Sequence, residues 1–181
     1  QGYHITEVLV DGINVGTGGS YTFSGVEDDH TVAASFEINT YTLTPVAGSN
    51  GSITPSVPQT VTYGSSQTFS MIPATGYHVS NVRVDGVSMG ALGSYTFADV
   101  TEDHIIETSF QINRYTITPS AGNHGSISPG LSQLVDHGGD LTFNFTPDIG
   151  YHVADVVVDG SSVGAVSSYT GEEYASIALG A

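Results

Sequence analysis

The feature that most constrains this chain is a constant spacing of 74 residues between near-identical stretches. GYHITEVLVDG begins at Gly2, GYHVSNVRVDG at Gly76 and GYHVADVVVDG at Gly150. Other landmarks keep the same offset, among them Ser20-Tyr21-Thr22 with Ser94-Tyr95-Thr96 and Ser168-Tyr169-Thr170, and Asp29-His30 with Asp103-His104. A constant period without insertions indicates an array of one structural module.

The period also predicts where the modules begin and end. Residues 1–39 correspond to the back half of a repeat, residues 40–112 to a complete repeat, and residues 113–181 to a third repeat whose last strand diverges after Thr170. No segment rich in proline, glycine or charge separates them, because Ile38-Asn39-Thr40 and Ile112-Asn113-Arg114 run directly from one repeat into the next. We therefore expect short junctions.

Residue patterns within each repeat favour β-strands. No window of ten or more residues shows an apolar period of 3.6, whereas Val, Ile, Thr, Tyr and Phe occur in short runs bounded by Gly, Asn, Asp and Pro. The expected fold class is all-β, with tandem small β-sandwich-like repeats of 74 residues. β-Grasp-like repeats are the alternative.

Three local predictions follow from these runs. Residues 41–45 alternate, turn at Gly48-Ser49-Asn50-Gly51 and return through Ile53 as a hairpin, since Asn-Gly tolerates positive φ. Tyr77 and Val79 are out of step with Val82 and Val84, so a bulge near Ser80-Asn81 is needed to place all four toward the core. The Asp-Gly pair that follows is a turn, and His78 points away from Tyr77.

Charge and cysteine content exclude several classes of function. The 18 acidic residues outnumber two basic ones, Arg83 and Arg114, and the formal net charge is −16. Such a surface repels phosphate backbones and anionic lipids, so nucleic acid and membrane insertion are not expected. The chain has no cysteine, and therefore no disulfide framework, thiolate nucleophile or iron-sulfur ligands.

One motif resembles a catalytic signature. Gly86-Val87-Ser88-Met89-Gly90 matches G-x-S-x-G, but a nucleophile elbow requires a helix after the serine, and a strand is expected here. The equivalent of Ser88 in the first repeat is Asn14, so the serine is replaceable within one chain. We interpret the motif as a hairpin loop and predict no catalytic residue and no enzyme activity.

Histidines and carboxylates are the remaining candidates for metal ligands. Five of the seven histidines recur at repeat positions, and a His78–His104 pair would lack further ligands of defined spacing, so half-exposed structural histidines are favoured. Hard oxygen ligands in loops suit calcium, which makes Asp28, Asp29, Glu102 and Asp103 the calcium candidates. No D-x-D-x-D-G loop occurs, and solvated carboxylates remain the favoured interpretation. No cofactor is otherwise expected.

Several short motifs recur in the same order in each repeat: Tyr-Thr-(Leu or Ile)-Thr-Pro, Gly-Ser-Ile, Gly-Tyr-His-Val, Val-Asp-Gly, Ser-Tyr-Thr-Phe, Val-Thr-Glu-Asp-His and Ser-Phe. In these motifs and their order, the chain from Gln1 to about Thr170 resembles the divergent internalin-B-type B-repeat family of bacterial surface and secreted proteins. The resemblance implies a location outside the cell or on the bacterial surface, and no activity of the module's own.

Three functions are consistent with these observations. The first is a non-catalytic extracellular repeat module that acts as a structural spacer or an adhesive array. The second is a filament subunit in which incomplete end repeats of neighbouring chains complement each other. The third is a carbohydrate-binding accessory module, although most of the ten tyrosines recur at structural positions. The expected partners are neighbouring repeats, other copies of the chain, and surface glycans or proteins.

Overall fold

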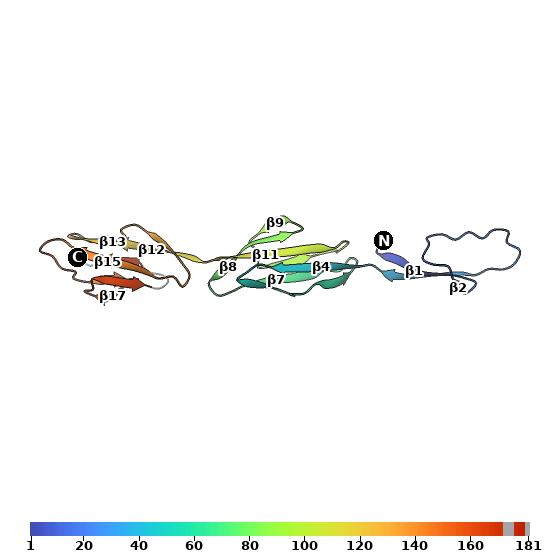
Figure 1. The fold of residues 1–181 in the computed structure, drawn as a ribbon, viewed down its shortest axis with the longest axis horizontal. Helices are drawn as coiled ribbons and strands as arrows, with labels where there is room; N and C mark the ends of the chain where they lie inside the picture. Colours follow the sequence, from blue (N-terminus) through green and yellow to red (C-terminus); the bar gives the residue numbers. More distant parts are fainter. Residues whose placement is uncertain (172–175, 180–181) are drawn as a thin grey trace. The chain divides into compact units, whose positions relative to one another are not determined.

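Strands form all of the regular structure in the described part of the chain (Figure 1). The computed structural model describes residues 1–171 and 176–179, and these residues contain no helix. The predicted all-β class with tandem repeats is therefore confirmed. The β-grasp alternative requires a helix, which the described part of the chain does not provide. Among the described residues, accordingly, no helix is long and apolar enough to cross a membrane.

The chain divides into two compact units. The first consists of residues 1–72 with 79–109, and the second of residues 73–78 with 110–181. The strands up to β11 are β1 (Tyr3–Val10), β2 (Ile13–Asn14), β3 (Val32–Ile38), β4 (Thr40–Ala47), β5 (Gly51–Thr54), β6 (Gln59–Thr62), β7 (Gln67–Pro73), β8 (Tyr77–Val84), β9 (Val87–Gly90), β10 (Ser94–Phe97) and β11 (His104–Ile112). The later strands are β12 (Arg114–Ser120), β13 (Gly125–Ser128), β14 (Gln133–Asp136), β15 (Leu141–Pro147), β16 (Val156–Val158), β17 (Ser161–Gly164), β18 (Ser168–Gly171) and β19 (Ser176–Leu179).

Residues 40–112 form two sheets. One has the order β6-β4-β11-β8-β9, and the other has the order β10-β7-β5. Strands β4 and β11 are parallel neighbours with His104 opposite Leu43, whereas β4 pairs with β6 in the antiparallel sense. The first half of the repeat, residues 40–73, thus supplies strands to both sheets, and so does the second half. We call residues 40–73 the front half and residues 77–112 the back half.

Residues 114–179 repeat this topology in the second unit. The sheet orders are β14-β12-β19-β16-β17 and β13-β15-β18. Strand β19 takes the place of β11, since it pairs parallel to β12 and antiparallel to β16, but it spans four residues where β11 spans nine. The predicted shortening of the last strand stays a prediction, because residues on both sides of β19 are not described. Residues 172–175 and 180–181 of the divergent stretch lie outside the described residues.

The core of the complete repeat lies between its two sheets. Leu43, Phe69, Val82 and Ile106 are fully buried, and they come from β4, β7, β8 and β11. The buried cluster comprises Leu43, Ile53, Phe69, Met71, Val82, Val84, Phe97, Val100 and Ile106. The second unit has its own cluster at the equivalent positions, Ile117, Ile127, Phe143, Phe145 and Val156. Each core therefore needs both halves of its repeat.

The bulge and the Asp-Gly turn are both present. In the first copy the β1–β3 register shifts between Ile5 and Glu7, which are the equivalents of Val79 and Asn81. After the shift Val8 and Val10 are buried, but Tyr3 is 63% exposed. In the complete repeat Val82 and Val84 are buried and Val79 packs against the core, whereas Tyr77 is half-buried and is not among the side chains packed on it, so the predicted core position of the tyrosine is wrong. Asp85 and Gly86 have φ values of 50° and 80° and connect β8 to β9. The left-handed region suits an Asp-Gly pair in a two-residue turn.

The predicted hairpin between residues 41–45 and Ile53 is wrong. Asn50 does adopt a positive φ of 68°, but β4 pairs with β6 and β11, whereas β5 joins the other sheet. Both edges of β4 are occupied, and the chain after Asn50 therefore crosses to the opposite layer. The turn chemistry is local and predictable, whereas the choice of sheet depends on pairing partners 16 to 61 residues away.

Phe69→Ala should destabilise the complete repeat by about 3–5 kcal/mol, because the ring is fully buried between the sheets and its loss leaves a cavity. Urea denaturation monitored by circular dichroism measures the change. Ser70→Ala, on the exposed side of the same strand, should change the free energy of unfolding by less than about 0.5 kcal/mol. Equal losses for the two variants would contradict this assignment of the core.

Candidate functional site

The serine of the G-x-S-x-G match belongs to a cross-strand pair. The Ser88 hydroxyl on β9 donates a hydrogen bond to Asn81 Oδ1 on β8, with 2.7 Å between the oxygens. The equivalent pairs are Asn14 with Glu7 at 2.9 Å and Ser162 with Asp155 at 2.6 Å. Both members of the pair change between repeats while the contact is kept, so the motif fastens a hairpin.

A histidine-aspartate contact closes the same hairpin onto the neighbouring strand. Asp85 Oδ2 accepts a hydrogen bond from His104 Nδ1 at 2.7 Å, and Asp85 Oδ1 accepts one from the Ile105 backbone N–H at 2.8 Å. Phe97 stacks on the His104 ring, with the centroids 4.9 Å apart. The first repeat has the same arrangement with Asp11, His30 and Phe23.

These contacts lower the pKa values of the two aspartates. The backbone N–H of Thr31, and then His30, lower the pKa of Asp11 below its ordinary value. Burial raises the pKa of Asp85, but the hydrogen bonds from Ile105 and His104 outweigh that effect, and its pKa is also lowered. The sequence reasoning missed this pair, although Asp11 with His30 and Asp85 with His104 recur together at the repeat spacing.

The histidines and carboxylates considered as metal ligands either bond to other protein groups or are exposed. His78 Nδ1 bonds to Asn113 and His104 Nδ1 to Asp85, so the two histidines of the proposed pair have separate partners. Asp103 Oδ1 accepts a hydrogen bond from the Thr42 N–H at 2.7 Å, and Asp28, Asp29 and Glu102 are exposed. Within residues 1–171 and 176–179, no group of three or more potential ligands is arranged to hold a metal. The calcium assignment stays a prediction.

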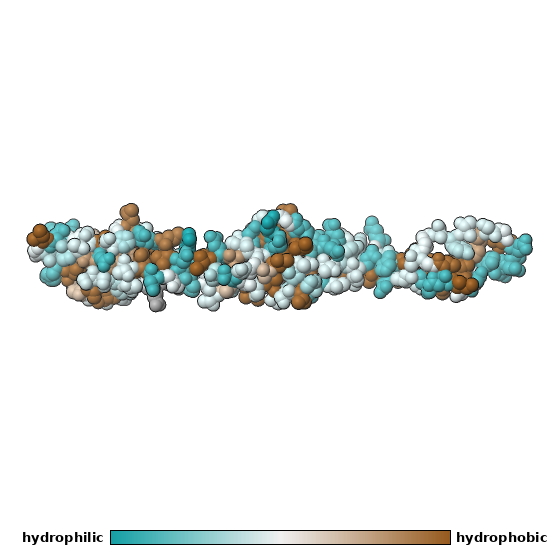
Figure 2. All heavy atoms as spheres, viewed as in Figure 1, coloured by the Kyte–Doolittle hydropathy of each residue, from teal (hydrophilic) through white to brown (hydrophobic). Residues whose placement is uncertain are grey.

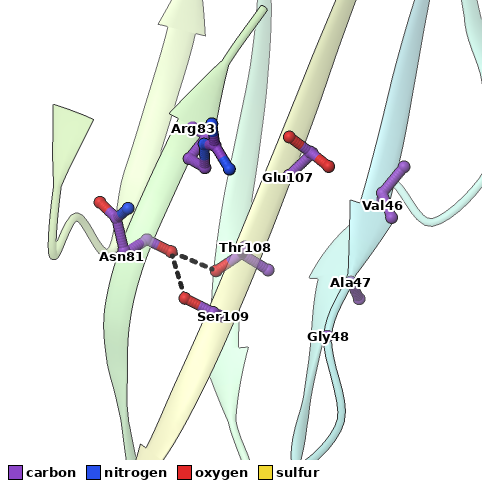
Figure 3. A pocket seen from close by; sticks show the side chains of 8 residues that line it. All are labelled: Val46, Ala47, Gly48, Asn81, Arg83, Glu107, Thr108 and Ser109. Carbon is purple, nitrogen blue, oxygen red and sulfur yellow. Dashed lines mark hydrogen bonds between the residues drawn. The ribbon is translucent and has the colours of Figure 1, made fainter. Parts of the chain in front are cut away.

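A shallow pocket of about 410 Å³ lies over β4, β8 and β11 of the first unit (Figure 3). Arg83 and Glu107 lie on neighbouring strands at its wall, and the hydroxyls of Thr108 and Ser109 point to the backbone oxygen of Asn81. Arg83 Nε and Nη2 both donate to the carbonyl oxygen of Gly86. The guanidinium is thus engaged by the hairpin turn.

The contact set that recurs most completely surrounds a single asparagine between repeats. Asn39 is the only residue between β3 and β4, and Asn113 is the only residue between β11 and β12. Asn39 donates its N–H to the Gly2 oxygen at 2.8 Å, and its own carbonyl accepts from the Tyr63 N–H at 2.8 Å. The Asn39 side-chain oxygen accepts from His4 Nδ1 at 2.9 Å.

Asn113 makes the same three hydrogen bonds in the second unit. Its partners are the Gly76 oxygen at 2.8 Å, the His137 N–H at 2.9 Å and His78 Nδ1 at 2.8 Å. Each glycine also lies against the ring that follows the third strand of the next repeat, because a Cβ on Gly2 would overlap Tyr63 and one on Gly76 would overlap His137. This set, which we call the asparagine junction, explains the glycine and the histidine of the recurring Gly-Tyr-His.

These features define the class of protein as a tandem array of β-sandwich repeats with one-residue junctions. The model of the divergent InlB B-repeat domain matches residues 41–114 and 115–173, and the chain belongs to that family. No curated protein and no solved structure shows a significant match. The family suggests a bacterial surface or secreted repeat module, and modules of this kind are typically non-catalytic.

The Asp85 contact predicts a specific dependence of stability on pH. The folded-state pKa of Asp85 lies below its unfolded-state value, so the ionised carboxylate stabilises the fold above the unfolded pKa, and this contribution is lost as the pH falls through the folded pKa. The Tm of Asp85→Asn should therefore lie below that of the parent chain near pH 7 and converge with it toward about pH 2. Asparagine also tolerates the positive φ at this turn.

A non-titrating variant provides the control for that measurement. Ser88→Ala removes a hydrogen bond from the same hairpin, and its effect on Tm should not change with pH. A Tm difference between Asp85→Asn and the parent chain that is constant from about pH 7 to about pH 2 would refute the assigned role of the carboxylate.

Gly76→Ala tests the packing at the asparagine junction. Gly76 and Gly90 both have a φ of 81°, but an added Cβ meets His137 at Gly76 and nothing within 4 Å at Gly90. Gly90→Ala should cost about 1–2 kcal/mol for the left-handed backbone alone. Gly76→Ala should cost at least about 1 kcal/mol more because of the overlap, as measured by urea denaturation. Equal costs would mean that the ring does not pack tightly on the glycine.

Proposed function

We propose that this chain is a non-catalytic extracellular spacer whose repeats are mechanically coupled through the asparagine junctions. The observation that carries the proposal is the recurrence of the same three hydrogen bonds around Asn39 and Asn113. A flexible array would not need fixed partners for the backbone N–H, the backbone carbonyl and the side-chain oxygen of a linker residue. A spacer that holds other domains at a distance benefits from links that resist rotation.

The energetics of the junction support this role. An intramolecular hydrogen bond contributes about 1 kcal/mol net, so three bonds and a ring packed on glycine supply a few kcal/mol at each junction. In repeat arrays, stability is approximately the sum of the stability of each repeat and nearest-neighbour terms. A junction term of this size brings the unfolding transitions of adjacent repeats closer together.

The high negative charge is compatible with the same role. Repulsion between acidic surfaces keeps copies of a protein apart in solution. Only two of the residues are basic, against 18 acidic ones. The charge therefore opposes random association and favours a chain that acts as a separator.

The filament alternative is less well supported by the strand order. It required incomplete repeats at both ends of the chain, but β19 fills the place of the last strand in the third repeat. Residues 114–147, the front half of that repeat, are paired with their own back half and are not free to complete another chain. Assembly by complementation would first have to open a folded repeat.

Asn113→Ala provides the test of coupling. The variant removes the side-chain bond to His78 and should lower the junction term by about 1 kcal/mol, so that the complete repeat and the third repeat unfold at more widely separated urea concentrations. Hydrogen exchange of β7 and β15 amides as a function of urea reports the two repeats separately.

Asn144→Ala is the matched control, because Asn144 is an exposed asparagine on β15, away from the junction. It should leave the two transitions as they are in the parent chain. If Asn113→Ala and Asn144→Ala unfold with the same midpoints and the same cooperativity, the junction does not couple the repeats and the spacer proposal fails.

A further inference from the structure

The shallow pocket over β4, β8 and β11 combines two opposite charges with an apolar side chain. Its volume of about 410 Å³ lies within the range of about 300–1,000 Å³ that is typical of sites for small ligands. Arg83 on β8 and Glu107 on β11 lie on neighbouring strands, and Val46 on β4 lies on the other side of Glu107 (Figure 3). The remaining lining residues are Ala47, Gly48, Asn81, Thr108 and Ser109.

The two charged side chains of the pocket do not recur at the repeat spacing. The equivalents of Arg83 are Leu9 and Val157, and the equivalent of Glu107 in the first repeat is Ala33. Leu9 lies directly opposite Ala33 in the sheet, so the same pair of strands forms there without either charge. The fold therefore does not require an arginine beside a glutamate at these positions, and the pair is specific to the complete repeat.

The two charges do not neutralise each other directly. Among residues 1–171 and 176–179, no ion pair joins Arg83 to Glu107, whereas the other basic residue, Arg114, is paired with Asp136 at 2.7 Å. Arg83 Nε and Nη2 donate to the Gly86 carbonyl oxygen at 3.1 and 2.8 Å, which fixes the plane of the guanidinium. A group that is held in place before binding loses less conformational entropy when a ligand arrives.

The pattern of donors and acceptors selects the class of ligand. A guanidinium only donates hydrogen bonds, and an ionised carboxylate only accepts them. A hydroxyl group does both, so two adjacent hydroxyls of one sugar ring can bridge the arginine and the glutamate. An anionic ligand would meet Glu107 in a chain whose net charge is −16, and a cationic ligand would meet Arg83. A neutral ligand with adjacent hydroxyls is therefore favoured.

The apolar part of the pocket suits the same ligand. Val46 is 45% exposed, and Ala47 next to it is also exposed. Figure 2 shows apolar and polar residues side by side on the surface of the complete repeat that is in view. A sugar ring carries C–H groups on its faces and hydroxyls at its edge, and removing C–H groups from water against apolar side chains is favourable. Such a ring can thus use both kinds of contact at once.

We propose that this pocket binds a neutral sugar unit of a glycan. Arg83 donates a hydrogen bond to one ring hydroxyl, Glu107 accepts one from the adjacent hydroxyl, and the face of the ring packs on Val46. The site belongs to the complete repeat alone, in contrast to the tyrosines that recur at structural positions. This inference does not depend on the spacer role, because it requires no coupling between repeats.

The test titrates the isotope-labelled full chain with three neutral trisaccharides, cellotriose, mannotriose and maltotriose. At least one of them should shift the amide NMR signals of residues 46–48, 81–83 and 107–109 in a saturable manner, without shifting those of the equivalent residues 120–122 and 155–157. Arg83→Leu and Glu107→Ala introduce the residues of the first repeat. Each should weaken binding at least about tenfold, because each removes a hydrogen bond to a charged group.

Arg114→Leu is the matched control for Arg83→Leu. It removes the other basic residue and changes the net charge by the same amount, at a position that does not line the pocket, so it should leave binding unchanged. Circular dichroism should show that Arg83→Leu and Glu107→Ala keep the strand content of the parent chain.

The proposal is overturned if none of the three trisaccharides binds, if Arg83→Leu and Arg114→Leu weaken binding equally, or if the signals of both repeats shift alike. Two charged probes complete the set, because the pair of charges could also match them. Binding of glycylglycine or of trigalacturonic acid in place of the neutral sugars would assign the pocket to a zwitterionic or an anionic ligand and would overturn the proposal too.

Discussion

The structure depends on one constraint, which is that a repeat of 74 residues can bury a core only when its two halves meet. The central side chains of the complete repeat come both from the front half, on β4 and β7, and from the back half, on β8 and β11. A single sheet of three or five strands has one apolar face that water would cover. The parallel pairing of β4 with β11 brings the first and the last strand of the repeat together, and this long-range contact closes the sandwich.

The same pairing explains the position of the junction. The last strand of one repeat, β11, ends at Ile112, and the first strand of the next, β12, begins at Arg114. A single residue therefore makes the transition between the repeats. Asparagine is suited to it, since it offers a backbone donor, a backbone acceptor and a side-chain acceptor within one short residue. Asn39 and Asn113 use all three. A linker normally exposes its backbone polar groups to water, whereas here they form hydrogen bonds with neighbouring segments of the chain.

Much of the local structure could be predicted from the sequence. The phase slip between Tyr77-Val79 and Val82-Val84 predicts the bulge, and Asp85-Gly86 predicts the turn, because both depend on neighbouring residues alone. The sheet to which β5 belongs could not be predicted, since it depends on the occupied edges of β4. The Asp85–His104 contact spans 19 residues and was missed for a similar reason, although its recurrence as Asp11–His30 was a usable signal.

The two copies of Ser-Tyr-Thr-Phe show how far tertiary context decides the conformation of this chain. Their intrinsic β-propensity is identical, yet only residues 94–97 form a strand, and only they have β7 as a neighbour. β-Propensity mostly measures how well side chains pack against cross-strand partners, so it vanishes when those partners are absent. The conformation of this tetrapeptide therefore depends on the strand beside it in the second layer, as the pairing of Tyr95 with Phe69 shows.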